Sequence, residues 1–401
     1  MIMEKDANRI KYLDGLRGLA ALVVFVGHYN MLFNCNIFFN GLSLLNLSKL
    51  PKVIYFPLNA LVLFFTNGNL SVSIFFILSG FALSYPYFST KNHEVIVTST
   101  LKRYFRLTVP ILFTVLLISF LYSFNLFYSK ADVLSLRVTQ DTYLFYNGRI
   151  ETNFLMALCN GLYSCLALGS KYYNPVLWTM GVEFYGSLLV FAVIGIFGIS
   201  TIRFYVYIIL ILFFIDNYYY LFIAGVAASD LYNTKAQTTY FNKPWLGLGL
   251  LFIGFIVSVF YFNKFMLTHL PIGELNTNKV HAINRVAALF IVAGVLFSTI
   301  AQKALMKNSC LQLGKISFML YLLHVPFMSI VSVFFIKLFE KILPYNVTIE
   351  LAFFTTTLLL FLSCKYIFIF FDKWGVDFSK WVVTSILSKK PYFLPKDKEV
   401  Q

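Results

Sequence analysis

Residues 14–28 read DGLRGLAALVVFVGH, so three ionisable side chains stand at the entrance and within the body of a long apolar run. In a helix that turns about 100° per residue, Arg17 and His28 return almost to the same angle, and Asp14 falls within about 40° of that face. One helix would then carry a carboxylate and a guanidinium at its entrance and an imidazole about 16 Å deeper. Because an ionisable group at the centre of a membrane helix costs about 2.5–3.5 kcal/mol, its default interpretation is functional. We therefore expect Asp14, Arg17 and His28 to serve catalysis.

The composition of the chain indicates a membrane protein. Of the 401 residues, 59% are hydrophobic and only 12% are charged, whereas soluble domains contain about 25% charged residues. The long uncharged runs predict an all-α integral membrane protein. The formal net charge of +15 does not indicate nucleic-acid binding, because the lysines and arginines are scattered between apolar runs instead of forming one basic face.

Ten apolar runs predict a polytopic bundle of about ten transmembrane helices. The runs lie near residues 12–33, 70–88, 107–127, 176–198, 204–217, 218–233, 244–262, 285–303, 316–337 and 350–371. A shorter stretch at 53–66 is typical of a re-entrant or interfacial helix. We assign residues 1–376 to a membrane domain and 377–401 to a cytosolic tail, and we expect no cleavable leader.

The distribution of basic residues predicts the orientation. With the N-terminus in the cytosol, 19 of the lysines and arginines outside the spans face the cytosol and 8 face the opposite side. Cytosolic segments carry the excess of positive charge in membrane proteins. Together with an even number of spans, this bias predicts that both termini are cytosolic.

The cysteines predict neither a disulfide framework nor a metal site. Their number is odd and no CxxC pair occurs, so we interpret them as small apolar packing residues. They are Cys35, Cys159, Cys165, Cys310 and Cys364. The sequence has no metal-ligand spacing and no glycine-rich phosphate loop, so we expect no bound metal and no nucleotide hydrolysis.

Two segments in the first third of the chain could contact a ligand. FFILSGFAL, residues 75–83, contains the pair Ser79 and Gly80, which could serve close helix packing or let a ligand approach the backbone. KRYFRLTVP, residues 102–110, places Arg103 and Arg106 one helical turn apart. They could anchor the membrane surface or clamp phosphate oxygens.

Two later segments place ionisable groups within apolar runs. LWTMGVEFYGS, residues 177–187, contains Glu183, which could form a structural ion pair with a buried cation or orient an imidazole. SFMLYLLHVPF, residues 317–327, supplies a second intramembrane histidine, His324. Histidine suits general-base work because it changes charge near neutral pH, although a histidine can also simply lock two helices together.

Taken together, these segments resemble the acyltransferase-3 family of polytopic membrane O-acyltransferases over residues 10–376. The most specific element is Arg17 and His28 with ten residues between them, and the other four segments follow in the family's order. The sequences of residues 177–187 and of FDKWGVDF, residues 371–378, resemble fungal or other eukaryotic members more than bacterial polysaccharide acetylases. We expect no appended esterase-like domain.

The resemblance implies an enzyme that moves an acyl group from acyl-CoA to a hydroxyl of a carbohydrate, a lipid-linked glycan or a small molecule. The acyl-CoA, with acetyl-CoA favoured, would be a co-substrate and not a tightly bound cofactor, and membrane lipids would be the other partner. Arg17 and His28 carry over as the essential pair, and His28 would act as general base. The remaining candidates are Asp14, Glu183 and His324 for catalysis and Arg103, Arg106, Ser79 and Gly80 for the donor.

A proton-coupled transporter or flippase is the alternative. The intramembrane Asp, Arg, Glu and histidine residues could form a proton relay. A transporter would more often show Gly/Pro-broken spans at matching positions of two halves, which this sequence does not show. A non-enzymatic sensor on the same fold is disfavoured because the Arg17 and His28 pair is intact.

Overall fold

The computed structural model describes residues 10–33, 51–128, 150, 152–234, 243–260 and 277–388. These residues form helices joined by short turns, and no strand occurs among them, so the all-α prediction is confirmed. The helices in chain order are α1 (Lys11–Phe33), α2 (Lys52–Phe65), α3 (Gly68–Thr90), α4 (Glu94–Ser123), α6 (Phe154–Cys159), η2 (Asn160–Ser164), α7 (Cys165–Ala167), η3 (Pro175–Leu177), α8 (Trp178–Phe197), α9 (Arg203–Phe213), α10 (Tyr219–Asn233), α12 (Pro244–Phe260), α14 (Thr277–Phe297), α15 (Thr299–Leu305), α16 (Asn308–Phe327), η4 (Met328–Ser332), α17 (Val333–Phe339), α18 (Tyr345–Ser363), η5 (Cys364–Phe368) and α19 (Ile369–Ser388).

Seven helical stretches of the described residues are long and apolar enough to cross a membrane. They are Lys11–Phe33, Gly68–Thr90, Glu94–Ser123, Pro175–Phe197, Asn278–Phe297, Asn308–Phe339 and Tyr345–Ile386. Three apolar helices are shorter, namely Phe154–Ala167, Arg203–Phe213 and Pro244–Val259. The multi-pass membrane fold is thus confirmed, whereas the expected count of about ten spans stays a prediction.

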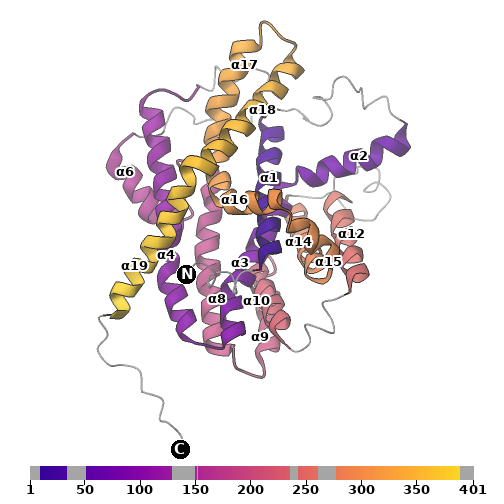
Figure 1. Ribbon diagram of the computed structural model, residues 1–401, viewed down its shortest axis with the longest axis vertical. Coiled ribbons are helices and arrows are strands. Elements are labelled where there is room, and N and C mark those ends of the chain that lie inside the picture. Colours follow the sequence, from indigo (N-terminus) through magenta and orange to yellow (C-terminus); the bar gives the residue numbers. More distant parts are fainter. Residues whose placement is uncertain are drawn as a thin grey trace, which may run out of the picture.

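The outer surface of the bundle is apolar, as a lipid-facing surface must be. On α9, for example, Ile208, Ile209, Leu212 and Phe213 are each more than half exposed. Helix α2 has 14 residues, too few for the roughly 20 that a span needs. It projects sideways from the bundle, away from α1 (Figure 1).

Helix α1 lies at the centre, with α16 along one side and α3 along another. Glycines allow this close contact. A Cβ atom added to Gly18 would lie 2.4 Å from the backbone nitrogen of Gly314, and one added to Gly15 would lie 2.1 Å from the carbonyl oxygen of Leu305. No larger residue fits at such distances, so the backbone of α1 touches that of α16 at Gly18 and that of α15 at Gly15. Small residues serve this purpose in membrane bundles.

The last helix extends beyond the expected domain boundary. Helix α19 runs to Ser388, so the boundary that we placed after residue 376 falls within a helix. The reason lies in its packing: α19 runs alongside α4 (Figure 1), and a Cβ atom on Gly375 would lie 3.0 Å from the carbonyl oxygen of Arg106. The segment FDKWGVDF, residues 371–378, is therefore part of a helix that packs against the bundle. The rest of the expected tail, residues 389–401, lies outside the described residues.

The four cysteines that the structure describes are free thiols, and two of them, Cys165 and Cys364, are buried. Cys35 lies outside the described residues. Among the residues that are described, no group of three His, Cys, Asp or Glu side chains gathers. The expectation of a metal-free site stays a prediction.

Candidate functional site

Two intramembrane histidines meet at the contact between α1 and α16. Nε2 of His324 lies 2.9 Å from Nδ1 of His28, and the two rings are stacked with centroids 5.0 Å apart. His324 is almost fully buried, whereas His28 is half-buried. The sequence singled out both residues, and the structure brings them together although they lie on helices far apart in the chain.

The backbone of α16 fixes the tautomers of the pair. Nδ1 of His324 lies 2.7 Å from the carbonyl oxygen of Tyr321, which can only accept, so Nδ1 carries the hydrogen. In the neutral ring, Nε2 of His324 then has a lone pair and accepts from Nδ1–H of His28. This arrangement leaves the lone pair of His28 on its Nε2 atom.

Hydrogen bonds from neighbouring elements hold this part of α16 and α1 in place. The Tyr321 hydroxyl lies 2.9 Å from the hydroxyl of Thr179 on α8, and the Asn174 side chain donates to the carbonyl oxygen of Leu322 at 2.7 Å. Directly after the histidine on α1, the hydroxyl of Tyr29 donates to the carbonyl oxygen of Ile349 on α18 at 3.2 Å.

A cavity of about 250 Å³ reaches Tyr321, the neighbour of His324, and neither histidine is among its lining residues. It is lined from α1, α3, α4, α8, α16 and α19. Its charged residues are four cations and two carboxylates: Arg17, Arg103, Arg106, Lys315, Glu183 and Asp372. Its volume is below the roughly 300–1,000 Å³ of typical small-molecule sites. The cavity can therefore take part of a large anionic ligand.

Two of these cations make no ion pair within the described part of the chain. They are Arg106 on α4 and Lys315 on α16, and both are exposed. Cations that converge on a cavity from different helices can bind phosphate oxygens. The arrangement thus has the chemistry of an anion site.

Arg103 and Glu183 instead pair with each other. The guanidinium forms a buried ion pair with the carboxylate, and its Nε donates to the hydroxyl of Ser187 at 2.6 Å. The sequence left two roles open for Glu183, and this contact is the structural ion pair. Among the described residues, Glu183 contacts neither histidine. Both residues still line the cavity.

The remaining predicted residues divide between the cavity and helix packing. Ser79 lines the cavity and Gly80 does not. A Cβ atom on Gly80 would lie 2.1 Å from the carbonyl oxygen of Phe222, so Gly80 serves the packing of α3 on α10. Asp14 does not line the cavity, and its carbonyl oxygen lies against Gly314 at the crossing of α1 and α16.

Among the cavity residues that the sequence analysis did not single out, three have ionisable side chains. Lys315 was counted only as a topology residue, although it stands directly before the segment that contains His324. Asp372 was considered only as part of FDKWGVDF, and Tyr321 was one tyrosine among 26. Its spacing of three residues from His324, which equals one helical turn, was a signal that could have drawn attention to Tyr321.

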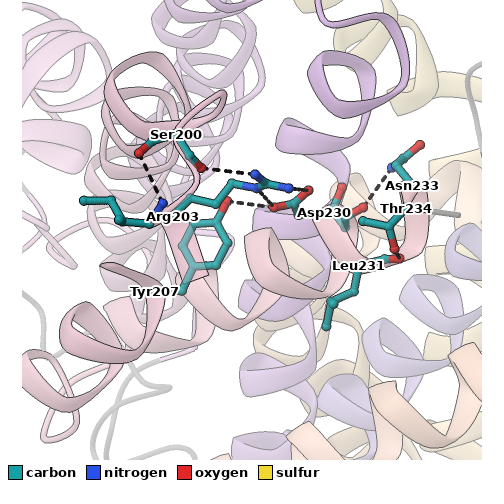
Figure 2. A network of polar contacts seen from close by, with 9 residues as sticks. Ser200, Arg203, Tyr207, Asp230, Leu231, Asn233 and Thr234 are labelled. Carbon is teal, nitrogen blue, oxygen red and sulfur yellow. Dashed lines mark hydrogen bonds and ion pairs between the residues drawn. The ribbon is translucent and has the colours of Figure 1, made fainter. Parts of the chain in front are cut away.

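A second buried polar network lies away from this cavity, between α9 and α10 (Figure 2). Nε of Arg203 lies 2.5 Å from Oδ2 of Asp230, which also accepts from the hydroxyl of Tyr207 at 3.3 Å. Arg203 further donates to the carbonyl oxygen of Ser200 at 3.1 Å. Since Asp230 is only 1% exposed, the network acts as a staple between the two helices.

Fold and site together define a polytopic all-α membrane protein with a paired intramembrane histidine beside a cation-lined cavity. A family model described as an acyltransferase domain, that of the acyltransferase-3 family, matches residues 10–370. The chain therefore belongs to this family of membrane acyltransferases, as its sequence motifs predicted. Comparisons with curated proteins and with solved structures give no match.

Proposed function

We propose that the protein transfers an acyl group from acyl-CoA to a hydroxyl acceptor, with His28 as the general base. Membership of the family supports acyl transfer. The hydrogen bond of 2.9 Å between His28 and His324 supports the finer assignment, because its direction leaves the lone pair on Nε2 of His28. An unprotonated imidazole nitrogen is what a general base requires.

In the proposed reaction, the acceptor hydroxyl gives its proton to Nε2 of His28 while its oxygen attacks the carbonyl carbon of the thioester. The imidazolium that forms keeps its Nδ1–H bond to His324, which stabilises the new charge. The tetrahedral intermediate then breaks the carbon–sulfur bond, and His28 returns the proton to the departing CoA thiolate. Base catalysis of this kind contributes about 10²–10⁴-fold to a rate.

The cavity is suited to the donor. CoA carries several negative phosphate charges, and Arg17, Arg106 and Lys315 bring positive charge to one cavity. In the orientation that the basic residues favour, this end of α1 faces the cytosol, where acyl-CoA is present. The acceptor would be a hydroxyl of a carbohydrate, a lipid-linked glycan or a small molecule.

The test uses the purified protein in lipid nanodiscs with radiolabelled acetyl-CoA. We expect the wild type to release CoA and form labelled product or acetate, and His28→Ala to lower this rate at least about 100-fold. Ile209→Ala, on the exposed face of α9, is the matched control and should keep the wild-type rate. The base assignment is wrong if His28→Ala, eluting as the wild type does, keeps more than about a tenth of the rate.

A wild type that consumes no acetyl-CoA but moves a solute along a proton gradient would instead be a transporter.

A further inference from the structure

The cavity has a polar mouth and an aromatic inner end. On α16 its lining runs from Lys315 to Tyr321, six residues and about 9 Å along the helix. On α8 it runs inward from Glu183 to Thr179. At the inner end, Phe75 lies edge-on to Tyr321 with ring centroids 5.9 Å apart. A ligand that enters past the cations therefore meets this aromatic pair at its tip.

Tyr321 is a fixed wall and not a movable side chain. It is 6% exposed, and its hydroxyl lies 2.9 Å from the hydroxyl of Thr179 and 3.3 Å from the carbonyl oxygen of Val176. To rotate away, the ring would have to give up both contacts in a buried environment, where unpaired polar groups are costly.

Tyr321 also adjoins the histidine pair. His324 follows Tyr321 by one turn of α16, about 4.5 Å along the axis, and their ring centroids are 5.8 Å apart. The carbonyl oxygen of the same Tyr321 holds Nδ1 of His324. One residue thus closes the cavity with its side chain and orients the histidine pair with its backbone.

We propose that Tyr321, latched by Thr179 and backed by Phe75, sets the maximum length of the acyl group and restricts the donor to short acyl chains. The acyl group at the tip of the donor packs against the two rings, so the rings set how deep the thioester carbonyl can lie. Each further methylene finds the space occupied and pushes the carbonyl back toward the mouth. Tyr321 and Phe75 are then specificity-determining residues.

This inference rests on the proposed function, because it assumes an acyl-CoA donor. The test compares CoA release from acetyl-CoA and from octanoyl-CoA by the full-length protein in nanodiscs. We expect the wild type to prefer acetyl-CoA by about tenfold or more, since a hydrophobic pocket discriminates by about 10–200-fold for each methylene. Tyr321→Ala and Phe75→Ala should each raise the octanoyl-to-acetyl ratio about tenfold or more.

Two further variants separate the wall from its latch. Thr179→Val keeps the tyrosine ring but removes its hydroxyl partner, so the ratio should rise less than in Tyr321→Ala. Ile209→Ala is the lipid-facing control and should leave the ratio unchanged. Size-exclusion elution shows which variants fold, and Phe75→Ala tests the wall even if Tyr321→Ala does not.

The outcomes distinguish the two proposals. In one outcome, the wild type consumes acetyl-CoA while the octanoyl-to-acetyl ratio is unchanged in the folded alanine variants. Tyr321 and Phe75 then do not limit the length of the acyl group, and the proposed function remains. If the wild type binds radiolabelled acetyl-CoA without consuming it, displacement by octanoyl-CoA gives the same comparison between variants. If it neither binds nor consumes either donor, both proposals fail.

Discussion

His28 donates through Nδ1–H to Nε2 of His324 at 2.9 Å, although 296 residues separate the two in the chain. His324 in turn donates to the carbonyl oxygen of Tyr321. The relationship is directional, because a carbonyl at one end fixes where every hydrogen lies. His324 therefore acts on His28 as an acceptor that orients the ring, and the two residues should behave as one unit.

We predict that His324→Ala slows acyl transfer about 10- to 100-fold, because the loss of a hydrogen bond to a charged group costs about 1.5–3 kcal/mol. His28→Ala should cost more, and the double variant should be no slower than His28→Ala alone, as expected for residues that act together. The measurement is the kcat of the three variants with acetyl-CoA. Multiplicative losses would show that the histidines act independently.

Loss of Arg106 or Lys315 should weaken binding of the donor, whereas loss of Arg103 should lower the stability of the protein. Arg106→Ala and Lys315→Ala each remove an exposed cation without an ion pair, so each should raise the KM for acetyl-CoA about tenfold and leave kcat and stability nearly unchanged. Arg103→Ala should instead destabilise the protein by about 3–5 kcal/mol, because it leaves Glu183 buried without its cation. Steady-state kinetics and thermal unfolding separate the two effects. An unchanged KM in both variants would show that Arg106 and Lys315 only anchor their helices at the membrane surface.

The staple between α9 and α10 should contribute to stability and not to chemistry. Asp230→Ala leaves Arg203 without its buried carboxylate, so the melting temperature should fall. The matched control is Asp377→Ala, whose partner Lys380 lies 3.6 Å away on an exposed surface and whose loss should cost no more than about 1 kcal/mol. Thermal unfolding in one detergent compares the two variants. Equal melting temperatures would show that the network is dispensable.

The donor site requires a defined orientation, with both termini in the cytosol. In a cysteine-free background, we expect Asn92→Cys to react with an impermeant maleimide only from the cytosolic face and Asn217→Cys only from the opposite face. Both positions are exposed, and the excess of basic residues on one side is the basis of the prediction. The reverse pattern would place the mouth of the cavity away from the cytosolic acyl-CoA.

The sequence predicted the fold because the signal for each helix lies in consecutive residues. The spacing of apolar residues and the rarity of charges predicted an all-α membrane protein, and every predicted run overlaps one or more helices of the described residues. It also singled out residues that the structure gathers around one cavity, among them Arg17, Arg103, Arg106 and Glu183. Polar residues are costly in a membrane, so their presence is informative before any contact is known.

Which helices touch could not be predicted in the same way. The contact between His28 and His324 depends on the crossing of α1 and α16 at Gly18 and Gly314. The sequence around a glycine does not show which other helix will pack against it. Pairing between helices is a property of packing and not of local sequence. The same reason explains why Lys315 was assigned to anchoring, and why the helical packing of Gly375 against α4 was not foreseen.

The long separation of the two histidines has a consequence for biosynthesis. A ribosome that adds about 5–20 residues per second needs about 15–60 s to proceed from one histidine to the other. Throughout that interval α1 lacks the helix whose Gly314 packs against Gly18. The histidine pair is thus assembled late, by the arrival of one helix, and a chain that stops before α16 never acquires it.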